Sequence, residues 1–463
     1  MTDLKLREHR VFTGQHLRAI SMPLGGIGAG SISVAGDGGL RHWQLFNQAE
    51  HVAHIPHSFF ALWTQSFGWE EPVLRVLQSG ALYDDEDFEV APLCTDHLVP
   101  QASRDLLAAC PGVESVEFEG EYPFARVRYQ DAALPVKVAL EAFSPVIPLD
   151  EKDSSLPTVV FTFRLTNPGE HSVSCCLAAS LQNAVGFVPG TTVTGVLNSG
   201  YGGNHNSLFH LQEGVGISMQ NSRLEANSAQ AGSMALFTTS KQALAKTQWD
   251  DLPAFFTELK RTGRLEGRDA TPSASGRTWD GALAVPFNLA PGASEEVTFI
   301  LAWHFPNRFV NWHQGWFGIP ESKSQYYLGN RYNNWFAGAT EVVDYVAGNL
   351  PRLREQTSTF VSALFDSPLP YSLLDAVSSQ VSTIFSPTCI QDEAGNLFGF
   401  EGCCGASAGG PLAMCGCCPL NCTHVWNYEM TLSKLYPRLE RSVREIDLHT
   451  QMTSEGGIPH RTV

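Results

Sequence analysis

The sequence predicts a protein of mixed β and α class, with a large β-sandwich over residues 1–330 followed by an all-α domain over residues 331–463. Before residue 330, short runs of alternating apolar and polar residues are separated by glycine and proline. After residue 330, apolar residues recur every three or four positions, as on one face of a helix. A chain of 463 residues is long enough for more than one hydrophobic core.

Three segments illustrate the strand pattern. Residues 113–129 alternate on either side of a break at residues 120–123. Residues 158–169 alternate and end in an Asn-Pro-Gly turn signal, and residues 295–305 form a further candidate strand. The acidic run at residues 83–89 is interpreted as a solvated turn.

Three segments carry the helical period. Their apolar positions are Trp335, Ala339, Val342, Val343, Val346, Leu350 and Leu353; Leu373, Leu374, Val377, Val381 and Ile384; and Val425, Tyr428, Leu432, Leu435, Leu439, Val443 and Ile446. Pro351 and Pro437 are expected to kink or divide the first and the last segment.

Composition excludes some classes of function. The net charge of -17 argues against a nucleic-acid partner, since such binding needs clustered Lys and Arg to neutralise phosphates. The first twenty residues lack the apolar core of a signal peptide, and no run of about eighteen apolar residues occurs. We therefore expect a cytoplasmic protein without a transmembrane segment, and the sequence leaves peripheral membrane contact open.

A glycine-rich segment at residues 23–51 invites a nucleotide-binding interpretation. Its glycine spacing differs from G-x-G-x-x-G, no Lys-Ser/Thr pair follows, and no βαβ pattern surrounds it. We interpret these glycines as positions where the backbone runs close to another part of the chain. The following residues 41–44, Arg-His-Trp-Gln, are either ordinary strand surface or the lining of a cleft.

Six of the eleven cysteines lie within residues 403–422. A zinc site built from Cys415, Cys418, Cys422 and His424 is one interpretation, but the adjacent cysteine pairs in this run do not match the usual two-plus-two ligand spacing. Disulfides are a second interpretation, and reduced, buried cysteines are the third and favoured one. We predict no metal and no cofactor.

Glu401 opens the same stretch, directly after an aromatic and apolar run. A carboxylate in a loop beside a helical domain suits a catalytic base or nucleophile. On local sequence alone, a surface or helix-capping glutamate is the simpler interpretation.

Several motifs, in order along nearly the whole chain, resemble glycoside hydrolase family 116. They are "PLGGIGAGSI", "RHWQLF", "LAWHFPN", "NRYNNWF", "FEG", "THVWNYEM", "LYPRLERSVRE" and "GGIPH". The resemblance implies an N-terminal β-sandwich and a C-terminal (α/α)6 barrel, of which residues 331–463 would be the first part. It also implies a β-glucosidase or glucosylceramidase type of activity on a small-molecule or glycolipid β-glycoside.

The resemblance also implies roles for individual residues. Glu401 of "FEG" matches the catalytic nucleophile of a retaining, double-displacement mechanism, in which a second carboxyl group acts as acid and base. His460 of "IPH" matches a histidine that contacts the sugar, and Trp426 of "THVWNYEM" is assigned to the same pocket.

Two departures from the family pattern stand out. His424 occupies the position of a sugar-binding aspartate, after an inserted Gly/Cys segment, and imidazole lacks the fixed negative charge of a carboxylate. The acid/base of the family lies far downstream of the nucleophile, and we identify no matching residue before Val463. We therefore expect the chain to be an inactive piece of a longer enzyme, cut within the catalytic domain.

Other interpretations remain open on the sequence. Within the enzyme class they are a β-xylosidase or a β-N-acetylglucosaminidase of the same family. Outside it, an inert carbohydrate-binding or scaffold fragment would also lack an acid/base. The sugar, the aglycone and the oligomeric state are not determined by the sequence.

Overall fold

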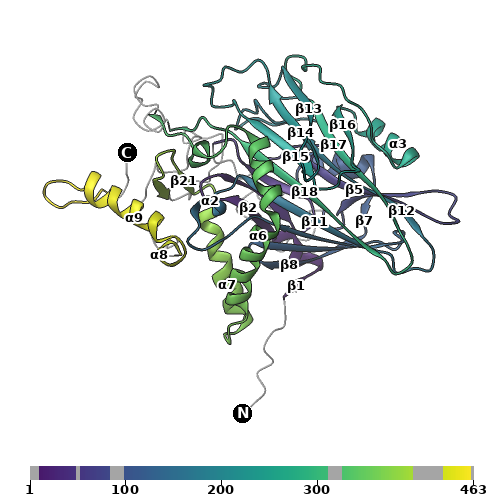
Figure 1. The fold of residues 1–463 in the computed structure, drawn as a ribbon, viewed down its shortest axis with the longest axis horizontal. Helices are drawn as coiled ribbons and strands as arrows, with labels where there is room; N and C mark the ends of the chain where they lie inside the picture. Colours follow the sequence, from purple (N-terminus) through teal and green to yellow (C-terminus); the bar gives the residue numbers. More distant parts are fainter. Residues whose placement is uncertain (1–9, 48–52, 84–98, 311–325, 400–430, 460–463) are drawn as a thin grey trace, which may run out of the picture.

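Two stacked β-sheets form the bulk of the molecule in a computed structural model, with helices on their outer faces (Figure 1). The structure describes residues 10–47, 53–83, 99–310, 326–399 and 431–459. The sheet-rich architecture predicted for the N-terminal part is confirmed.

The larger sheet has nine antiparallel strands. Their order is β1 (Val11–Phe12), β8 (Ser115–Glu121), β9 (Phe124–Gln130), β10 (Lys137–Phe143), β11 (Thr158–Thr166), β18 (Ser294–His304), β15 (Ser233–Thr238), β14 (Val215–Asn221) and β13 (Asn204–His210). The strands predicted within residues 113–129, 158–169 and 295–305 are β8 with β9, β11, and β18.

The second sheet has six strands, and a smaller sheet has three. The six are β16 (Leu244–Trp249), β17 (Asp280–Leu289), β12 (Val173–Gln182), β5 (Phe59–Ser66), β6 (Val73–Ser79) and β7 (Gly112–Val113). The three are β2 (Ser21–Gly26), β3 (Gly30–Ala35) and β4 (Leu40–Gln44). Two-stranded pairs are β19 (Phe309–Val310) with β20 (Tyr326–Tyr327), and β21 (Cys389–Gln391) with β22 (Leu397–Gly399).

Phenylalanine side chains fill the space between the two large sheets. Phe60 of β5 packs on Phe163 of β11 with ring centroids 4.8 Å apart, and on Phe299 of β18 at 5.9 Å. All three are buried. Full burial of one such ring contributes about 1.5–3 kcal/mol, so this layer is a major stabilising element of the sandwich.

Helix α6 (Ala339–Phe365) covers the outer face of the nine-stranded sheet (Figure 1). Its buried face includes Val342, Val343 and Val346, in one hydrophobic cluster with Ile300 of β18. Of the expectation that Pro351 kinks or divides the helix, the division is wrong, because α6 runs through Pro351. Apolar burial on both sides of the proline holds the helix together despite the lost backbone hydrogen bond.

The helices after α6 follow the predicted period only in part. In α7 (Tyr371–Val381), Leu374 is buried, whereas Leu373 and Val377 are 47% and 44% exposed. The predicted helix is present, but only the face with Leu374, Ser378 and Val381 is buried among the described residues. Pro437 does divide the last segment into α8 (Leu432–Leu435) and α9 (Pro437–Glu445), where it takes the first helical position.

Helices within the sheet region were not anticipated from the sequence. They are α1 (Gln101–Ala109), α2 (Glu151–Ser154) and α3 (Leu252–Thr262), and short helical turns are η1 (Gly14–Ala19), η3 (Arg331–Asn334), η4 (Ser382–Phe385) and the π-helical η6 (Ile446–Thr450). The signals of α3 are present in the chain. Asp251 caps its N-terminus through the Ala254 amide, and Gly263 ends it in the left-handed conformation.

Three further expectations concern a membrane span, the helical barrel and the domain boundary. No described helix is long and apolar enough to cross a membrane. The (α/α)6 barrel stays a prediction, as does the domain boundary at residue 330.

Candidate functional site

The hairpin of β21 and β22 ends one residue before the segment that contains Glu401. The hairpin is buried, with Gln391 and Leu397 inaccessible to solvent. Its turn is closed by the Asp392 side chain, which accepts a hydrogen bond from the Asn396 amide at 2.7 Å. Gly395 in this turn has φ +92°, a conformation that side-chain-bearing residues rarely adopt. The hairpin therefore gives the chain a fixed start for the segment that follows.

The glycine-rich turn between β2 and β3 packs directly on this hairpin. Gly28 has φ +68°, and a Cβ atom there would overlap the backbone nitrogen of Gln391. The neighbouring Ile27 amide donates to the Ser154 carbonyl at 2.8 Å, and the Ser155 hydroxyl donates to the Gln391 side chain at 3.2 Å. The prediction that these glycines permit close backbone approach is confirmed.

Arg308 joins two more chain segments to the same place. Its Nε donates to Oδ1 of Asn330 at 2.8 Å, its Nη1 to the Asn47 carbonyl at 3.3 Å, and its Nη2 to the Gly28 carbonyl at 3.5 Å. Nδ2 of Asn330 also donates to Oδ1 of Asn47 at 2.8 Å. Burial lowers the pKa of the Arg308 guanidinium below its ordinary value.

We call Gly28, Asn47, Arg308, Asn330 and Gln391 the loop-base cluster. It lies where residues 47, 310 and 399 lead into chain segments that the structure does not describe. In this cluster the Arg308 guanidinium donates its hydrogen bonds to backbone carbonyl and side-chain amide oxygens. No carboxylate among the described residues forms an ion pair with Arg308.

Glu393, in the turn of the hairpin, extends these contacts to η3. The Tyr327 hydroxyl donates to Oε2 of Glu393 at 2.9 Å, and Nδ2 of Asn334 donates to the Glu393 carbonyl at 2.8 Å. Nη1 of Arg331 donates to the same carbonyl at 3.3 Å. The motif "NRYNNWF", one of those that carry the family resemblance, therefore supports the hairpin that precedes Glu401.

The chain after residue 430 returns to the same hairpin and to α2. The Ser442 hydroxyl of α9 accepts a hydrogen bond from the Leu397 amide of β22 at 3.1 Å. The Tyr436 hydroxyl, between α8 and α9, donates to Ser154 Oγ at 2.9 Å. The chain before residue 400 and the chain after residue 430 are therefore both held by hydrogen bonds to α9 or α2.

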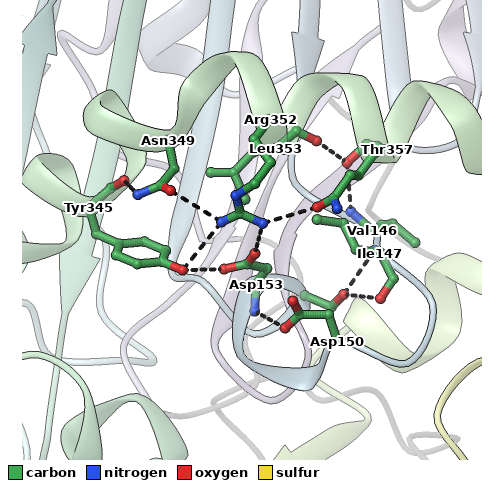
Figure 2. A network of polar contacts seen from close by, with 11 residues as sticks. Val146, Ile147, Asp150, Asp153, Tyr345, Asn349, Arg352, Leu353 and Thr357 are labelled. Carbon is green, nitrogen blue, oxygen red and sulfur yellow. Dashed lines mark hydrogen bonds and ion pairs between the residues drawn. The ribbon is translucent and has the colours of Figure 1, made fainter.

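Helix α2 provides that support because it is tied firmly to α6 (Figure 2). Asp153 is buried and accepts hydrogen bonds from Tyr345 at 2.7 Å and Arg352 at 2.6 Å. The Asp150 side chain caps α2 through the Asp153 amide at 3.0 Å. The hydrogen bond to Asp153 is the main cause that raises the pKa of Arg352.

The residues predicted from the sequence to act on substrate lie outside the described residues. These are Glu401, His424, Trp426 and His460, and the same holds for the zinc interpretation of Cys415, Cys418 and Cys422. Within the described ranges, no group of three or more His, Cys, Asp or Glu side chains is placed to hold a metal ion. Cys389 of β21 is buried.

The Arg-His-Trp-Gln segment at residues 41–44 is neither simple surface nor the lining of a described cleft. Trp43 is fully buried in the core, and Arg41 is buried in an ion pair with Asp37. Both lie on β4, where His42 and Gln44 stay partly exposed. Sequence reasoning missed the roles of Arg308, Asn330 and Gln391, although Asn330 opens the motif "NRYNNWF" and Arg308 directly follows "LAWHFPN".

Comparison with known families connects this arrangement to a class of proteins. A family model described as "beta-glucosidase 2, glycosyl-hydrolase family 116 N-term" matches residues 21–353, which is most of the chain. The chain belongs to glycoside hydrolase family 116. The match begins at β2 and ends inside α6, so it includes Gly28, Asn47, Arg308 and Asn330 of the loop-base cluster.

Solved structures similar to this family 116 chain include three carbohydrate-active proteins. A protein described as a kojibiose phosphorylase from the human microbiome is 9% identical, with a TM-score of 0.30 and coverage of 83% of this chain and 39% of its own. A bacterial glucoamylase in complex with acarbose is 8% identical, with a TM-score of 0.32 and coverage of 64% and 33%. A family GH92 inverting mannosidase from Bacteroides thetaiotaomicron is 10% identical, with a TM-score of 0.24 and coverage of 62% and 33%.

The family 116 chain thus spans about two fifths or less of the length of these structures. With TM-scores this low, the family assignment rests on the sequence match alone.

Proposed function

We propose that the protein is part of a retaining β-glycosidase that hydrolyses β-glucosides, with Glu401 as the nucleophile. The observation that carries this proposal is the match of residues 21–353 to a family description that names a beta-glucosidase. "FEG", with Glu401, follows the matched region in the order that the family resemblance implies. The aglycone is left open and includes lipids of the glucosylceramide kind.

In the proposed reaction, the ionised carboxylate of Glu401 attacks the anomeric carbon and displaces the aglycone oxygen. A second carboxyl group, which we assign to no residue of this chain, protonates that oxygen and then activates water to release the sugar. The two carboxyl groups of a retaining glycosidase lie about 5–5.5 Å apart. His424, Trp426 and His460 are proposed to contact the sugar.

The loop-base cluster supports this proposal because hydrogen bonds and close backbone packing hold the chain that precedes residue 400. A nucleophile must be held close to a near-attack position, and a misplacement of about 1 Å costs about a hundredfold in rate. Nε2 of Gln391, in this cluster, is buried without a hydrogen-bond partner among the described residues.

The test uses the complete gene product with a mechanism-based epoxide inhibitor of β-glucosidases and a panel of aryl β-glycosides. We expect covalent labelling and hydrolysis in the wild type, and loss of both in Glu401→Gln, with a fall in kcat of about 10³-fold or more. Glu355→Gln, on the exposed face of α6, is the matched control and should behave as wild type.

Three results would contradict parts of the proposal. Labelling that persists in Glu401→Gln means that another residue is the nucleophile. A highest kcat/KM on an aryl β-xyloside or β-N-acetylglucosaminide overturns the β-glucoside assignment. Saturable sugar binding without hydrolysis of any aryl β-glycoside favours the inert carbohydrate-binding alternative.

A further inference from the structure

A cavity of about 750 Å³ opens at one end of the β-sandwich, at the ends of β9, β10, β11 and β12. Thr166, the last residue of β11, lines this cavity. Thr158, at the other end of β11, comes shortly after the backbone of residues 155–156, which contacts Gly26 next to the loop-base cluster. Eight residue steps along a strand span about 26 Å. The cavity is therefore distinct from the loop-base cluster.

Strand register places three cationic side chains around one small residue, Ala139, in the lining of this cavity. Ala139 of β10 lies directly between Arg128 of β9 and Arg164 of β11. Neighbouring strands are about 4.8 Å apart, so the two arginine backbones are separated by about 10 Å with only a methyl group between them. Lys137, two residues before Ala139, projects from the same face of the sheet.

These cations are only partly neutralised by the protein itself. Among the described residues, Lys137 and Arg164 take part in no ion pair, and Arg128 contacts Glu117 at 3.6 Å and Glu119 at 3.5 Å.

The lining also contains two carboxylates. Asp131 is already held, since its carboxylate accepts from Nε of Arg75 at 2.7 Å and from the Ala133 amide at 2.8 Å. Glu170 is exposed in the loop after β11. In a chain of net charge -17, this cavity is a local site of cationic excess.

An aromatic side chain lines the same cavity. Trp69 is 43% exposed in the turn between β5 and β6, and its amide donates to the Ser66 carbonyl at 3.1 Å, which fixes the turn. Phe67 in the same turn is 77% exposed, and its ring lies 6.3 Å from that of His171, which also lines the cavity. An indole offers a broad apolar face together with a polar N–H group.

We propose that this cavity binds an acidic sugar, meaning a pyranose ring that carries a carboxylate or a phosphate group. The ring would pack on Trp69, and the anionic group would lie over Ala139 between Arg128, Lys137 and Arg164. Guanidinium groups bind carboxylates and phosphates through paired, charge-assisted hydrogen bonds. A neutral sugar would form no charge-assisted hydrogen bonds with these cations. A free inorganic anion would have no ring to pack on the indole. The cavity volume lies within the range of sites for small ligands.

Calorimetric titration of the 463-residue chain with four probes tests the proposal. The probes are D-glucuronate, glucose 6-phosphate, glucose and inorganic phosphate. We expect saturable binding of at least one acidic sugar, at least about tenfold tighter than that of glucose and of inorganic phosphate. The two acidic sugars distinguish a carboxylate ligand from a phosphate ligand.

Variants connect the binding to the cavity. We expect Arg164→Ala and Trp69→Ala each to weaken the acidic sugar about tenfold, and Arg164→Lys to recover part of the loss. Arg268→Ala, which removes an exposed arginine elsewhere, is the matched control and should bind as wild type. Circular dichroism of each variant verifies that it is folded.

Several outcomes would overturn the proposal. They are no saturable binding of either acidic sugar, equal binding of glucose, equal binding of inorganic phosphate, and unchanged binding in Arg164→Ala. Binding that is identical in Glu401→Gln separates this cavity from the proposed active site, so either proposal can fail without the other.

Discussion

At the scale of single residues, Gly28 shows how one position without a side chain fixes the geometry beneath the candidate site. Its backbone has φ +68° and contacts Gln391 closely enough to leave no room for a Cβ atom. Two costs therefore oppose any substitution, the left-handed backbone and the overlap with a neighbouring backbone.

We predict that Gly28→Ala destabilises the protein more than Gly292→Ala. Gly292 has φ +73°, and a Cβ atom added there would meet no other atom within 4 Å. Gly292→Ala therefore measures only the free-energy cost of the left-handed backbone conformation, about 1–2 kcal/mol. Overlap at Gly28 adds about 1–3 kcal/mol. Urea denaturation of both variants measures the difference, and equal midpoints would contradict the close contact.

His304, at the end of β18, is a buried histidine whose Nε2 has no hydrogen-bond partner in the described chain. Burial lowers its pKa below the ordinary value of about 6.5, although backbone hydrogen bonds and Glu341 oppose this effect. Between pH 6.5 and the lowered pKa, the imidazole of His304 binds a proton in the unfolded chain but not in the folded chain. The free energy of unfolding therefore decreases as the pH falls through this range.

We predict that His304→Phe flattens the loss of stability on acidification. Between pH 6.5 and the lowered pKa, His304 contributes a slope of at most about 1.4 kcal/mol per pH unit to the free energy of unfolding. Denaturant titrations at several pH values measure that slope. His210→Phe, at an exposed position on β13, is the matched control for replacing a histidine by phenylalanine. A wild-type slope in His304→Phe would contradict the assignment.

At the scale of secondary structure elements, the junction of α2 with α6 holds the helical region on the sandwich (Figure 2). Asp153 receives hydrogen bonds from Tyr345 and from Arg352, both on α6. The Arg352 side chain is 40% exposed and regains water when its partner is lost, so its contribution is smaller than that of a fully buried ion pair.

We predict that Asp153→Ala lowers the free energy of unfolding by about 1–3 kcal/mol, because the buried acceptor is lost together with its two bonds. Asp344→Ala, which removes an exposed carboxylate from α6, is the matched control and should change stability by less than about 0.5 kcal/mol. Guanidinium denaturation measures both variants. Increased hydrogen exchange in α6 should accompany the loss in Asp153→Ala, and its absence would show that the junction does not hold α6.

At the scale of the whole molecule, α6 belongs to the packing of the sandwich as well as to the helical region. Phe237 and Ile300 point outward from the nine-stranded sheet and share a hydrophobic cluster with Val343 and Val346 of α6. A chain without α6 would expose that apolar sheet face to water. The family match also extends into α6, to residue 353.

We predict that a chain ending at residue 330 is less stable than one ending at residue 366, just after α6. Exposure of the sheet face should lower the melting temperature by about 5 °C or more and increase binding of a hydrophobic dye. Calorimetry and dye fluorescence of the two chains measure these effects. Equal melting temperatures would support residue 330 as the boundary of an independent domain.

Much of the architecture follows from the sequence because short-range patterns encode it. Alternation identifies β11 and β18, and the Asn-Pro-Gly signal marks the end of β11. The glycines at residues 25–30 point to close backbone contact without showing what they contact. In α7, Leu374 is buried and Leu373 is exposed, although both fit the same apolar period. Periodicity alone does not show how much of a helix surface is buried.

The sequence by itself determined the strand-rich first part, the helical period after residue 330 and, through its motifs, the resemblance to family 116. Only the tertiary structure decided that Arg308, Asn330 and Gln391 meet Gly28 and Asn47 at one point. It also decided that α6 runs unbroken through Pro351. These contacts join residues up to several hundred positions apart, and their stability depends on burial and partner geometry that no local pattern contains.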